Sequence, residues 1–195
     1  MKWIRRGLLV LLAIPVLAVA VLAVAGQRSD AGRTRVQLVI DRPPAVVFRH
    51  IEDPQLLQKW TGLAEVELLG EPPVRVGSRA RAAVVARGRR TELESEVTAL
   101  EPDRLLALAM RTTGDAPVHL AVLSQYALEE RDGRTHLTVT AETSYQGVVA
   151  GLLEPLMTQA AQRELERQLT RLKAQVESEE QTPAPPAEAD APHAP

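Results

Sequence analysis

One long stretch, residues 147–177, carries its apolar side chains at helical rather than strand spacing. These side chains recur every three or four positions, which places them in a single stripe along one helix. They are Leu153, Met157, Ala161, Leu165, Leu169, Leu172 and Val176. Most of residues 34–145 are predicted to form short strands. A sheet with one apolar face needs a covering layer, and this helix is the one segment long enough to supply it.

The composition limits what the domain can contain. The chain has 195 residues, a net charge of −2 and no cysteine. Intermixed acidic and basic residues argue against a nucleic-acid surface, and the absence of cysteine excludes disulfides and thiol chemistry. Because only 3% of the residues are aromatic, the core must consist largely of Leu, Val and Ala. Small side chains of this kind leave room for a cavity.

The N-terminal segment is apolar and follows a basic start. Lys2, Arg5 and Arg6 precede residues 7–27, which carry no charge. About 20 such residues in a helix match the thickness of a bilayer core. We therefore predict a membrane anchor in residues 1–27, with residues 7–26 in the bilayer and residues 28–33 as a spacer. The alternative is a signal peptide that is cleaved near Ala25.

Both interpretations keep the basic N-terminus in the cytoplasm and place the following domain outside it. An anchor would make the protein a single-pass component of the cell membrane, whereas cleavage would give a secreted or periplasmic domain. We predict that residues 34–178 form this single domain. Residues 179–195 are rich in proline, alanine and acidic residues, which predicts a disordered tail.

The region before the long helix alternates in the manner of a sheet. A first strand over residues 34–41 is followed by two short helices, which begin at Pro43-Pro44 and at Asp53-Pro54. Further strands are predicted at residues 63–69, 78–87, 90–100, 104–111, 119–130 and 134–145. The strand at 104–111 is apolar on both faces, which favours a central position. Because proline lacks a backbone donor, the continuous part of the long helix is expected to start near Pro155, with residues 147–153 as a looser or kinked entry. A ligand is expected to pass at this entry, beside Leu153 and Met157.

Two hairpins are indicated by their turn residues. A turn at Gly88-Arg89 would place Arg81 opposite Glu96, within a ladder of charges on one face of the sheet. We interpret this face as the solvated outer surface. A patch for anionic lipid or nucleic acid is the alternative. The second hairpin turns at Asp132-Gly133.

Three stretches resemble one known family. They are residues 43–48 with Asp53-Pro54 and Trp60, residues 126–140, and residues 152–157 with Glu164-Leu165 and Leu172-Lys173. Their order resembles the helix-grip fold of the START/Bet v 1-like superfamily, also labelled polyketide cyclase/dehydrase or SRPBCC. The resemblance implies an α+β domain in which a curved antiparallel sheet of about seven strands wraps around a long C-terminal helix, with two short helices after the first strand. The superfamily includes lipid and polyphenol binders, cyclases, ring hydroxylases and chaperone regulators, so the fold by itself does not identify the ligand.

The sequence offers few groups for metal or nucleophilic chemistry. The four histidines, His50, His119, His136 and His193, are scattered, and none has the spacing of a metal ligand pair. Neither a glycine-rich phosphate loop nor a nucleophile elbow is present. We therefore predict no metal and no cofactor.

The strand positions that alternate toward the long helix are mostly apolar. Among them, Ser95, Ser124 and Tyr126 are the polar exceptions. An apolar lining with a few polar groups is typical of a pocket for a hydrophobic small molecule or lipid, which favours binding over catalysis. The candidate ligand-binding residues are Trp60, Ala82, Ser95, Leu108, Met110, Ser124, Tyr126, Leu153 and Met157. For Trp60 and Tyr126, ordinary core packing is the alternative interpretation.

Two other functions stay open at this stage. A cyclase or dehydrase of this fold would need an acid–base group inside the cavity, and Tyr126 is the candidate general acid. A non-catalytic interaction module would use the acidic tail and the charged sheet face as its contacts. The sequence predicts no nucleic-acid partner, and it leaves the ligand and the oligomeric state undetermined.

Overall fold

The computed structural model describes residues 32–86, 88–116, 119–145 and 148–179, with residues 148–155 described by their backbone alone. The predicted membrane anchor and residues 180–195 of the predicted tail lie outside these ranges. Among the helices within them, none is both long enough and apolar enough to span a bilayer.

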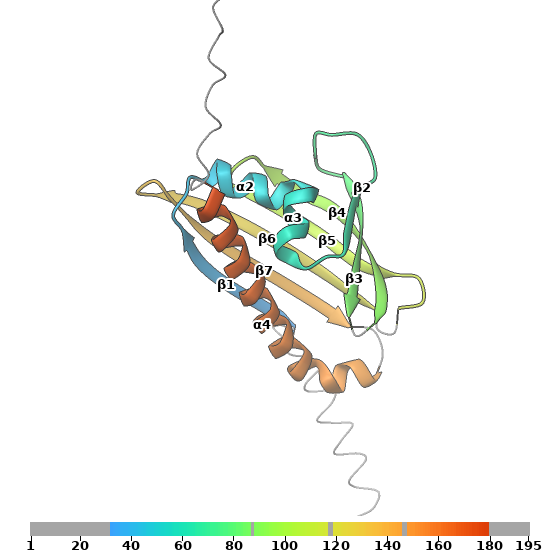
Figure 1. The fold of residues 1–195 in the computed structure, drawn as a ribbon. Coiled ribbons are helices and arrows are strands. Elements are labelled where there is room, and N and C mark those ends of the chain that lie inside the picture. Colours follow the sequence, from blue (N-terminus) through green and yellow to red (C-terminus); the bar gives the residue numbers. More distant parts are fainter. Residues whose placement is uncertain (1–31, 87, 117–118, 146–147, 180–195) are drawn as a thin grey trace, which may run out of the picture.

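The described chain forms one seven-stranded antiparallel sheet with three helices (Figure 1). The strands are β1 (Arg33–Ile40), β2 (Glu65–Leu68), β3 (Arg79–Ala86), β4 (Arg89–Glu101), β5 (Leu105–Thr113), β6 (Leu120–Arg131) and β7 (Arg134–Tyr145). The helices are α2 (Pro44–Glu52), α3 (Pro54–Thr61) and α4 (Val148–Ser178). Strand order across the sheet is β1-β7-β6-β5-β4-β3-β2, so β5 is central as predicted. This arrangement confirms the curved sheet and C-terminal helix of the helix-grip fold.

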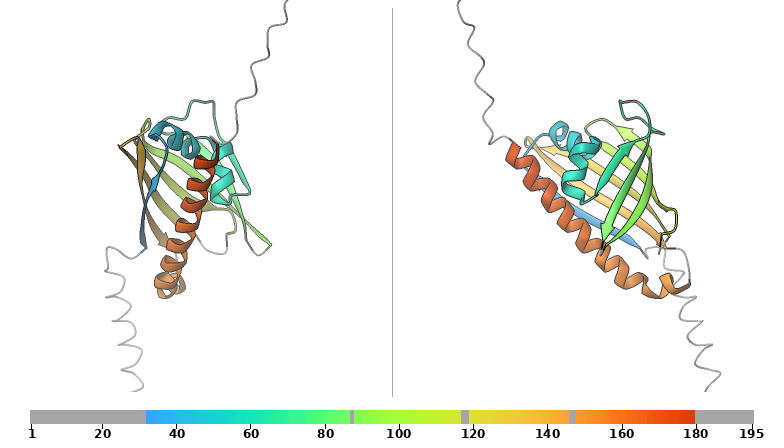
Figure 2. Two further views of the ribbon diagram at one scale, coloured as in Figure 1. Left: turned by 60° about the vertical axis from the view of Figure 1, so that its left-hand side comes forward. Right: turned by 45° about the vertical axis from the view of Figure 1, so that its right-hand side comes forward.

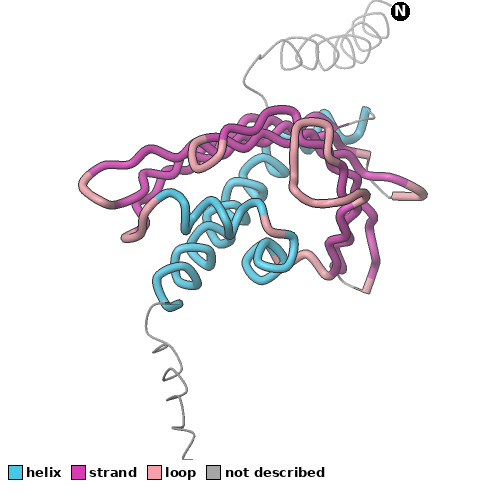
Figure 3. The backbone as a smooth tube through the Cα atoms, turned by 90° about the horizontal axis from the view of Figure 1, so that it is seen from above, coloured by secondary structure: helices cyan, strands magenta, loops and turns pink. Residues whose placement is uncertain are grey.

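All three helices lie on the concave side of the sheet (Figure 3), which we call the inner face. The strand registers join the predicted inward residues into one surface, since directly paired residues point to the same side. Leu106 pairs with Tyr126, and Tyr126 pairs in turn with Val139. A register shift between Val97 and Ala99 places a bulge in β4, and beyond this bulge Leu100 rather than Ala99 pairs with the buried inner-face residue Leu106.

The two ends of the sheet are covered differently. At one end, which we call the closed end, lie the 131–134 and 101–105 turns together with α2, α3 and the last turns of α4 (Figures 1 and 2). At the opposite end, the open end, β1, β4 and β6 begin, β3, β5 and β7 finish, and α4 starts. Gly32, the first described residue, lies at the open end because Thr143 of β7 donates a backbone hydrogen bond to its carbonyl oxygen.

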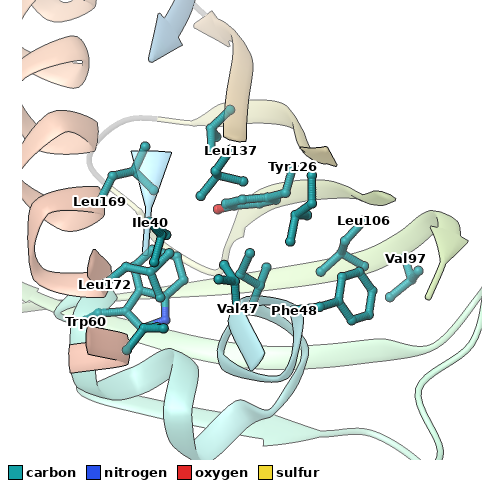
Figure 4. Packing of buried hydrophobic residues seen from close by; sticks show 14 residues of the cluster. Ile40, Val47, Phe48, Trp60, Val97, Leu106, Tyr126, Leu137, Leu169 and Leu172 are labelled. Atoms are coloured by element: carbon teal, nitrogen blue, oxygen red, sulfur yellow. The ribbon is translucent and has the colours of Figure 1, made fainter. Parts of the chain in front are cut away.

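The hydrophobic core gathers at the closed end (Figure 4). Val47 and Phe48 of α2, Leu169 and Leu172 of α4, and Leu137 of β7 all belong to one buried cluster. The predicted stripe of the long helix is confirmed here, because Leu169, Leu172 and Val176 are essentially fully buried. Each such side chain contributes roughly 1.5–3 kcal/mol through burial.

Trp60 closes this core from α3. Its side chain is completely buried, and its indole N–H donates a hydrogen bond of 2.9 Å to the carbonyl oxygen of His50. The indole also meets the ring of Tyr126 edge-on, with ring centres 6.5 Å apart. Asp53 caps the start of α3 by accepting hydrogen bonds from the backbone N–H groups of Gln55 and Leu56. This confirms the helix start predicted at Asp53-Pro54.

Helix α4 begins at Val148, earlier than predicted from Pro155. Its first turns run at an angle to the remainder of the helix (Figures 1 and 2). A bend beside a proline is expected, because proline removes one backbone hydrogen bond without ending the helix. The prediction of a kinked first section is therefore correct, and the prediction of where the helix starts is wrong.

Polar side chains of α4 cover the free edge of β1. Gln162 accepts a hydrogen bond from the backbone N–H of Arg35 and donates one to its carbonyl oxygen, at 3.3 and 3.2 Å. Lys173 donates to the carbonyl oxygen of Val39 at 2.6 Å, and Glu177 accepts from the backbone N–H of Asp41 at 2.9 Å. Exposed edge strands are templates for unwanted pairing. The helix therefore protects this edge as well as covering the inner face.

The turn residues decide the registers of the two hairpins. Asp132 and Gly133 have φ of 54° and 72°, and they form the predicted two-residue turn between Arg131 and Arg134. In the first hairpin the predicted register is wrong by two residues, since Arg79 rather than Arg81 pairs with Glu96. Pairing of Ala86 with Arg89 moves the turn one residue earlier than Gly88-Arg89.

Candidate ligand-binding site

A pocket lies on the inner face, between the sheet and the two short helices α2 and α3. We call it the sheet pocket, and it encloses about 90 Å³. Its floor comes from β2, β3, β4 and β5, and its roof comes from α2, α3, Leu63 and Val74. The lining residues are Ile51, Glu52, Pro54, Leu57, Leu63, Val66, Leu68, Val74, Ser78, Arg79, Ala80, Ala82, Leu93, Ser95, Val97, Leu106, Leu108 and Met110.

The lining is apolar apart from Glu52, Ser78, Arg79 and Ser95. The Ser95 hydroxyl donates to the carbonyl oxygen of Ala80 at 3.4 Å, a long hydrogen bond. Residues from α2, α3 and the strands dominate the described wall. This differs from the sequence hypothesis, which placed the cavity between the sheet and the C-terminal helix.

The predicted site residues divide into two groups. Ala82, Ser95, Leu108 and Met110 line the sheet pocket. Strand alternation brings them together, because Ala82 and Leu93 are paired, as are Ser95 and Met110. The pattern of small and apolar residues in the sequence was therefore sufficient to predict this part of the floor.

Trp60, Ser124 and Tyr126 lie in the core instead of in the lining of the pocket. Ser124 is 6% exposed and sits between Leu108 and Ala141 on the inner face. Burial raises the pKa of Tyr126 to about 12, so its phenol is a weaker acid than an exposed tyrosine. Both aromatic rings occupy the positions that the packing interpretation predicts.

The two helix residues proposed for the ligand path lie near the start of α4. The side chain of Leu153 falls outside the described residues. Met157 is half-buried and does not belong to the wall of the sheet pocket. The role of both residues in ligand binding stays a prediction.

Glu52 is a site residue that sequence reasoning missed. It is the last residue of α2, and its half-buried side chain reaches the sheet pocket. Burial raises the pKa of this carboxyl group, and the negative charges of Asp103 and Asp53 raise it further. Asp103 lies in the turn between β4 and β5, so the sequence offered no signal for this cluster beyond the adjacent Asp53.

A second contact that sequence reasoning missed joins His50 to Glu179. The buried imidazole donates from Nδ1 to the carbonyl oxygen of Val46 at 2.9 Å, and its Nε2 lies 3.0 Å from a carboxylate oxygen of Glu179. Burial raises the pKa of Glu179, but the hydrogen bond and charge of His50, with Arg49 and Lys59, hold it below the ordinary range. The residues are 129 positions apart, so spacing gave no sign of this pair.

A shallow depression of about 270 Å³ also occurs on the outer face of the sheet. Its apolar base includes Leu123, which is 58% exposed. Its rim carries charges that are already paired: Arg79 with Glu96 at 3.2 Å and Arg111 with Glu94 at 2.8 Å. Because each cation has a carboxylate partner, this face offers no surplus of positive charge for an anionic partner.

The sheet pocket is smaller than a typical small-molecule site, which encloses about 300–1,000 Å³. Part of its roof consists of irregular segments, with Leu63 between α3 and β2 and Val74 between β2 and β3. Gly62 and Gly77 have φ of 77° and 86° in or beside these segments. Segments without regular hydrogen bonding move more easily than a sheet. Enlarging the pocket therefore requires movement of the roof rather than of the floor.

Solved structures share the fold. A conserved protein from Geobacillus kaustophilus has a TM-score of 0.64 and 18% identity, covering 75% of this chain and 95% of its own. CV1439 from Chromobacterium violaceum has a TM-score of 0.61 and 21% identity over 75% and 97% of the two chains. Ara h 8.0201 has a TM-score of 0.61 and 15% identity over the same shares. At these identities the likeness concerns the fold.

The sequence comparisons identify the family. A search of curated protein sequences found no match. A family model described as "Polyketide cyclase / dehydrase and lipid transport" matches residues 31–177, which includes every described strand and nearly all of α4. The matched segment also contains every residue of the sheet pocket. The chain therefore belongs to the polyketide cyclase/dehydrase and lipid transport family.

Proposed function

We propose that this protein is a membrane-tethered, extracytoplasmic domain that binds a hydrophobic small molecule or lipid in the sheet pocket. The observation that carries the proposal is the lining of this pocket. Its floor is built from alanine, leucine, valine and methionine side chains, and its polar groups are few. Transfer of an apolar ligand onto such a surface is favourable by roughly 25 cal/mol per Å² of apolar area removed from water.

Glu52 adds a point of polar recognition to this pocket. A partly desolvated carboxyl group gains from a hydrogen-bond donor on the ligand, because unpaired polar groups in an apolar site are costly. A ligand with an apolar body and one hydroxyl or amino group would suit both the floor and Glu52. The description of the family, which includes lipid transport, is in keeping with such a ligand.

The tether is supported by the sequence of residues 1–27. The uncharged run of residues 7–26 is long enough for one crossing, and Lys2, Arg5 and Arg6 favour retention of the N-terminus in the cytoplasm. A hydrophobic ligand is poorly soluble in water. A domain that is held at the bilayer would therefore meet its ligand where that ligand is concentrated.

The two alternative functions have less support. Tyr126 packs against Trp60 away from the lining of the pocket, and its raised pKa disfavours a role as general acid. The charged face that an interaction module would use consists largely of ion pairs such as Arg79–Glu96. Its other expected contact, the acidic tail, lies almost wholly outside the described residues.

The test is to identify what the protein carries. The full-length chain would be purified from a membrane fraction, extracted with organic solvent and analysed by mass spectrometry. We expect one class of apolar molecule to be enriched over the bulk lipid. Ala82→Leu should reduce this enrichment about tenfold, because the larger side chain fills the floor of the pocket at a cost of roughly 1–3 kcal/mol to binding.

Ala121→Leu is the matched control. Ala121 is exposed on the outer face, so the same substitution there should leave the enrichment unchanged. An absence of any enriched molecule from the wild-type protein would contradict the proposed function. Equal loss in both variants would point to an effect on folding rather than on the pocket.

A further inference from the structure

We propose that the open end of the domain faces the bilayer and contacts its lipids through apolar side chains. This inference rests on the tether of the proposed function, and it adds an orientation and a docking surface. The docking surface consists of Val85, near the end of β3, and Leu156, in the early part of α4. Both lie at the open end, and they are 55% and 67% exposed.

The position of the first described residue limits the distance between this end and the membrane. Four residues, 28–31, separate Gln27 from Gly32. A fully extended chain advances about 3.3–3.6 Å per residue, so this spacer reaches on the order of 15 Å. Gly32 joins the open end through its hydrogen bond from Thr143. An anchor in residues 7–26 would therefore hold the open end close to the lipid headgroups.

The closed end is too distant for the same contact unless the domain lies on its side. β1 extends from Arg33 at the open end to Ile40 at the closed end. Eight strand residues span about 26 Å at 3.3 Å each. The exposed apolar residue Val76 belongs to the loop between β2 and β3, which lies at the closed end (Figure 1).

The charges at the open end favour docking through apolar groups over attraction to anionic lipid. Arg33 pairs with Glu142, Arg90 pairs with Glu65, and the guanidinium of Arg111 lies 2.8 Å from Glu94. Each of these three cations has an acidic partner, and Arg89, exposed at the start of β4, is one further cation at this end. The contact should therefore depend little on salt. We therefore assign a bilayer of neutral, zwitterionic lipid as the occupant of this surface.

This orientation would also place the inner face beside the lipid. At the open end, inner-face residues such as Leu93, Met110 and Val122 are half-buried, whereas their counterparts at the closed end are fully buried. Leu93 and Met110 also line the sheet pocket. An apolar ligand could then pass from the bilayer to the pocket along a surface that is mostly apolar.

The absence of cysteine from the chain allows a clean test by single-site labelling. Val85→Cys, Leu156→Cys and Val76→Cys would each be introduced into the full-length protein and labelled with an environment-sensitive fluorophore. The labelled proteins would be reconstituted into phosphatidylcholine vesicles with and without nitroxide-labelled lipid. Val76 is the matched control, since its 59% exposure is similar but it lies at the closed end.

At positions 85 and 156 we expect blue-shifted emission and strong quenching by nitroxide lipid. At position 76 we expect little of either effect. High salt should not change the emission or the quenching at any of the three positions. Protein that floats with the vesicles but shows equal quenching at all three positions would overturn the orientation and leave the tether standing. Quenching confined to position 76 would overturn it in the same way. Protein that does not float with the vesicles would overturn the tether and the inference together.

Discussion

The two ends of this domain are built from the same kinds of elements but differ in how completely their apolar side chains are covered. At the closed end, α2, α3 and the last turns of α4 bury Ile40, Trp60 and Leu172 completely. At the open end, inner-face residues such as Met110 are half-buried, and Leu156 of the same long helix is 67% exposed. The closed end therefore supplies stability, and the open end leaves apolar surface available for other molecules.

The difference arises from the path of α4 and from the chain that follows β1. The two short helices come directly after β1, so they can only cover the end where β1 finishes. Helix α4 lies along β1 and β7 (Figure 1). Polar side chains of α4, such as Lys173, form hydrogen bonds with the β1 edge. The inner faces of β3, β4 and β5 are left to the smaller α3 segment, and the sheet pocket forms beneath it.

The largest expected effect on stability comes from a comparison of two leucines in α4, one at each end of the domain. Leu172→Ala should lower the free energy of unfolding by about 3 kcal/mol, because it removes a fully buried side chain from the closed end and leaves a cavity. Leu156→Ala should change it by no more than about 0.5 kcal/mol. Urea unfolding of both variants measures the difference. Similar losses in the two variants would show that the ends do not differ in stability.

A smaller loss in the free energy of unfolding should come from the contact between His50 of α2 and Glu179, which directly follows α4 at the closed end. Glu179→Gln keeps an acceptor for His50 but removes the negative charge. Because Glu179 is partly exposed, we expect a loss of about 1 kcal/mol at pH 7. Glu71→Gln, a substitution in an exposed loop at the same end, is the control and should have no measurable effect.

The pH dependence of this loss follows from the lowered pKa of Glu179 in the folded protein. Because the pKa is lowered by folding, the contribution of Glu179 to stability is fully present above its pKa in the unfolded chain, about 4.3. This contribution is lost as the pH falls through the lower pKa of Glu179 in the folded protein. The difference in the free energy of unfolding between Glu179→Gln and the wild type should therefore shrink toward zero in acid. A stability difference that persists undiminished after the pH has fallen through the lowered pKa of Glu179 would contradict the charge interaction of its carboxylate.

The smallest expected effect concerns the edge of β1, between the two ends. Gln162→Ala removes both hydrogen bonds to the backbone of Arg35 and should speed hydrogen exchange at its amide, with a stability loss of about 0.5–1 kcal/mol. Gln168→Ala is a matched control on the same helix, because the described hydrogen bond of Gln168 goes to Glu164. Unchanged exchange at Arg35 would show that α4 does not protect this edge.

Much of the fold could be predicted because it depends on local periodicity. The stripe through Leu169, Leu172 and Val176 predicted the covering helix, and alternation predicted that Ser95 and Met110 face inward. Asp132-Gly133 predicted its hairpin register because both residues take positive φ readily. The first hairpin had a less specific turn, and its register was predicted two residues away from the observed pairing of Arg79 with Glu96.

The sequence by itself determined the order of the elements, the inward face of each strand and the apolar floor of the pocket, because these follow from spacing along one segment. Tertiary structure alone decided that α3 forms part of the roof of the pocket, that Glu52 reaches the pocket and that His50 meets Glu179. It also decided how much of the long helix is buried, from Leu172 at the closed end to Leu156 at the open end. The physical reason is that such contacts join residues far apart in the chain, and their formation depends on how whole elements pack rather than on local preference.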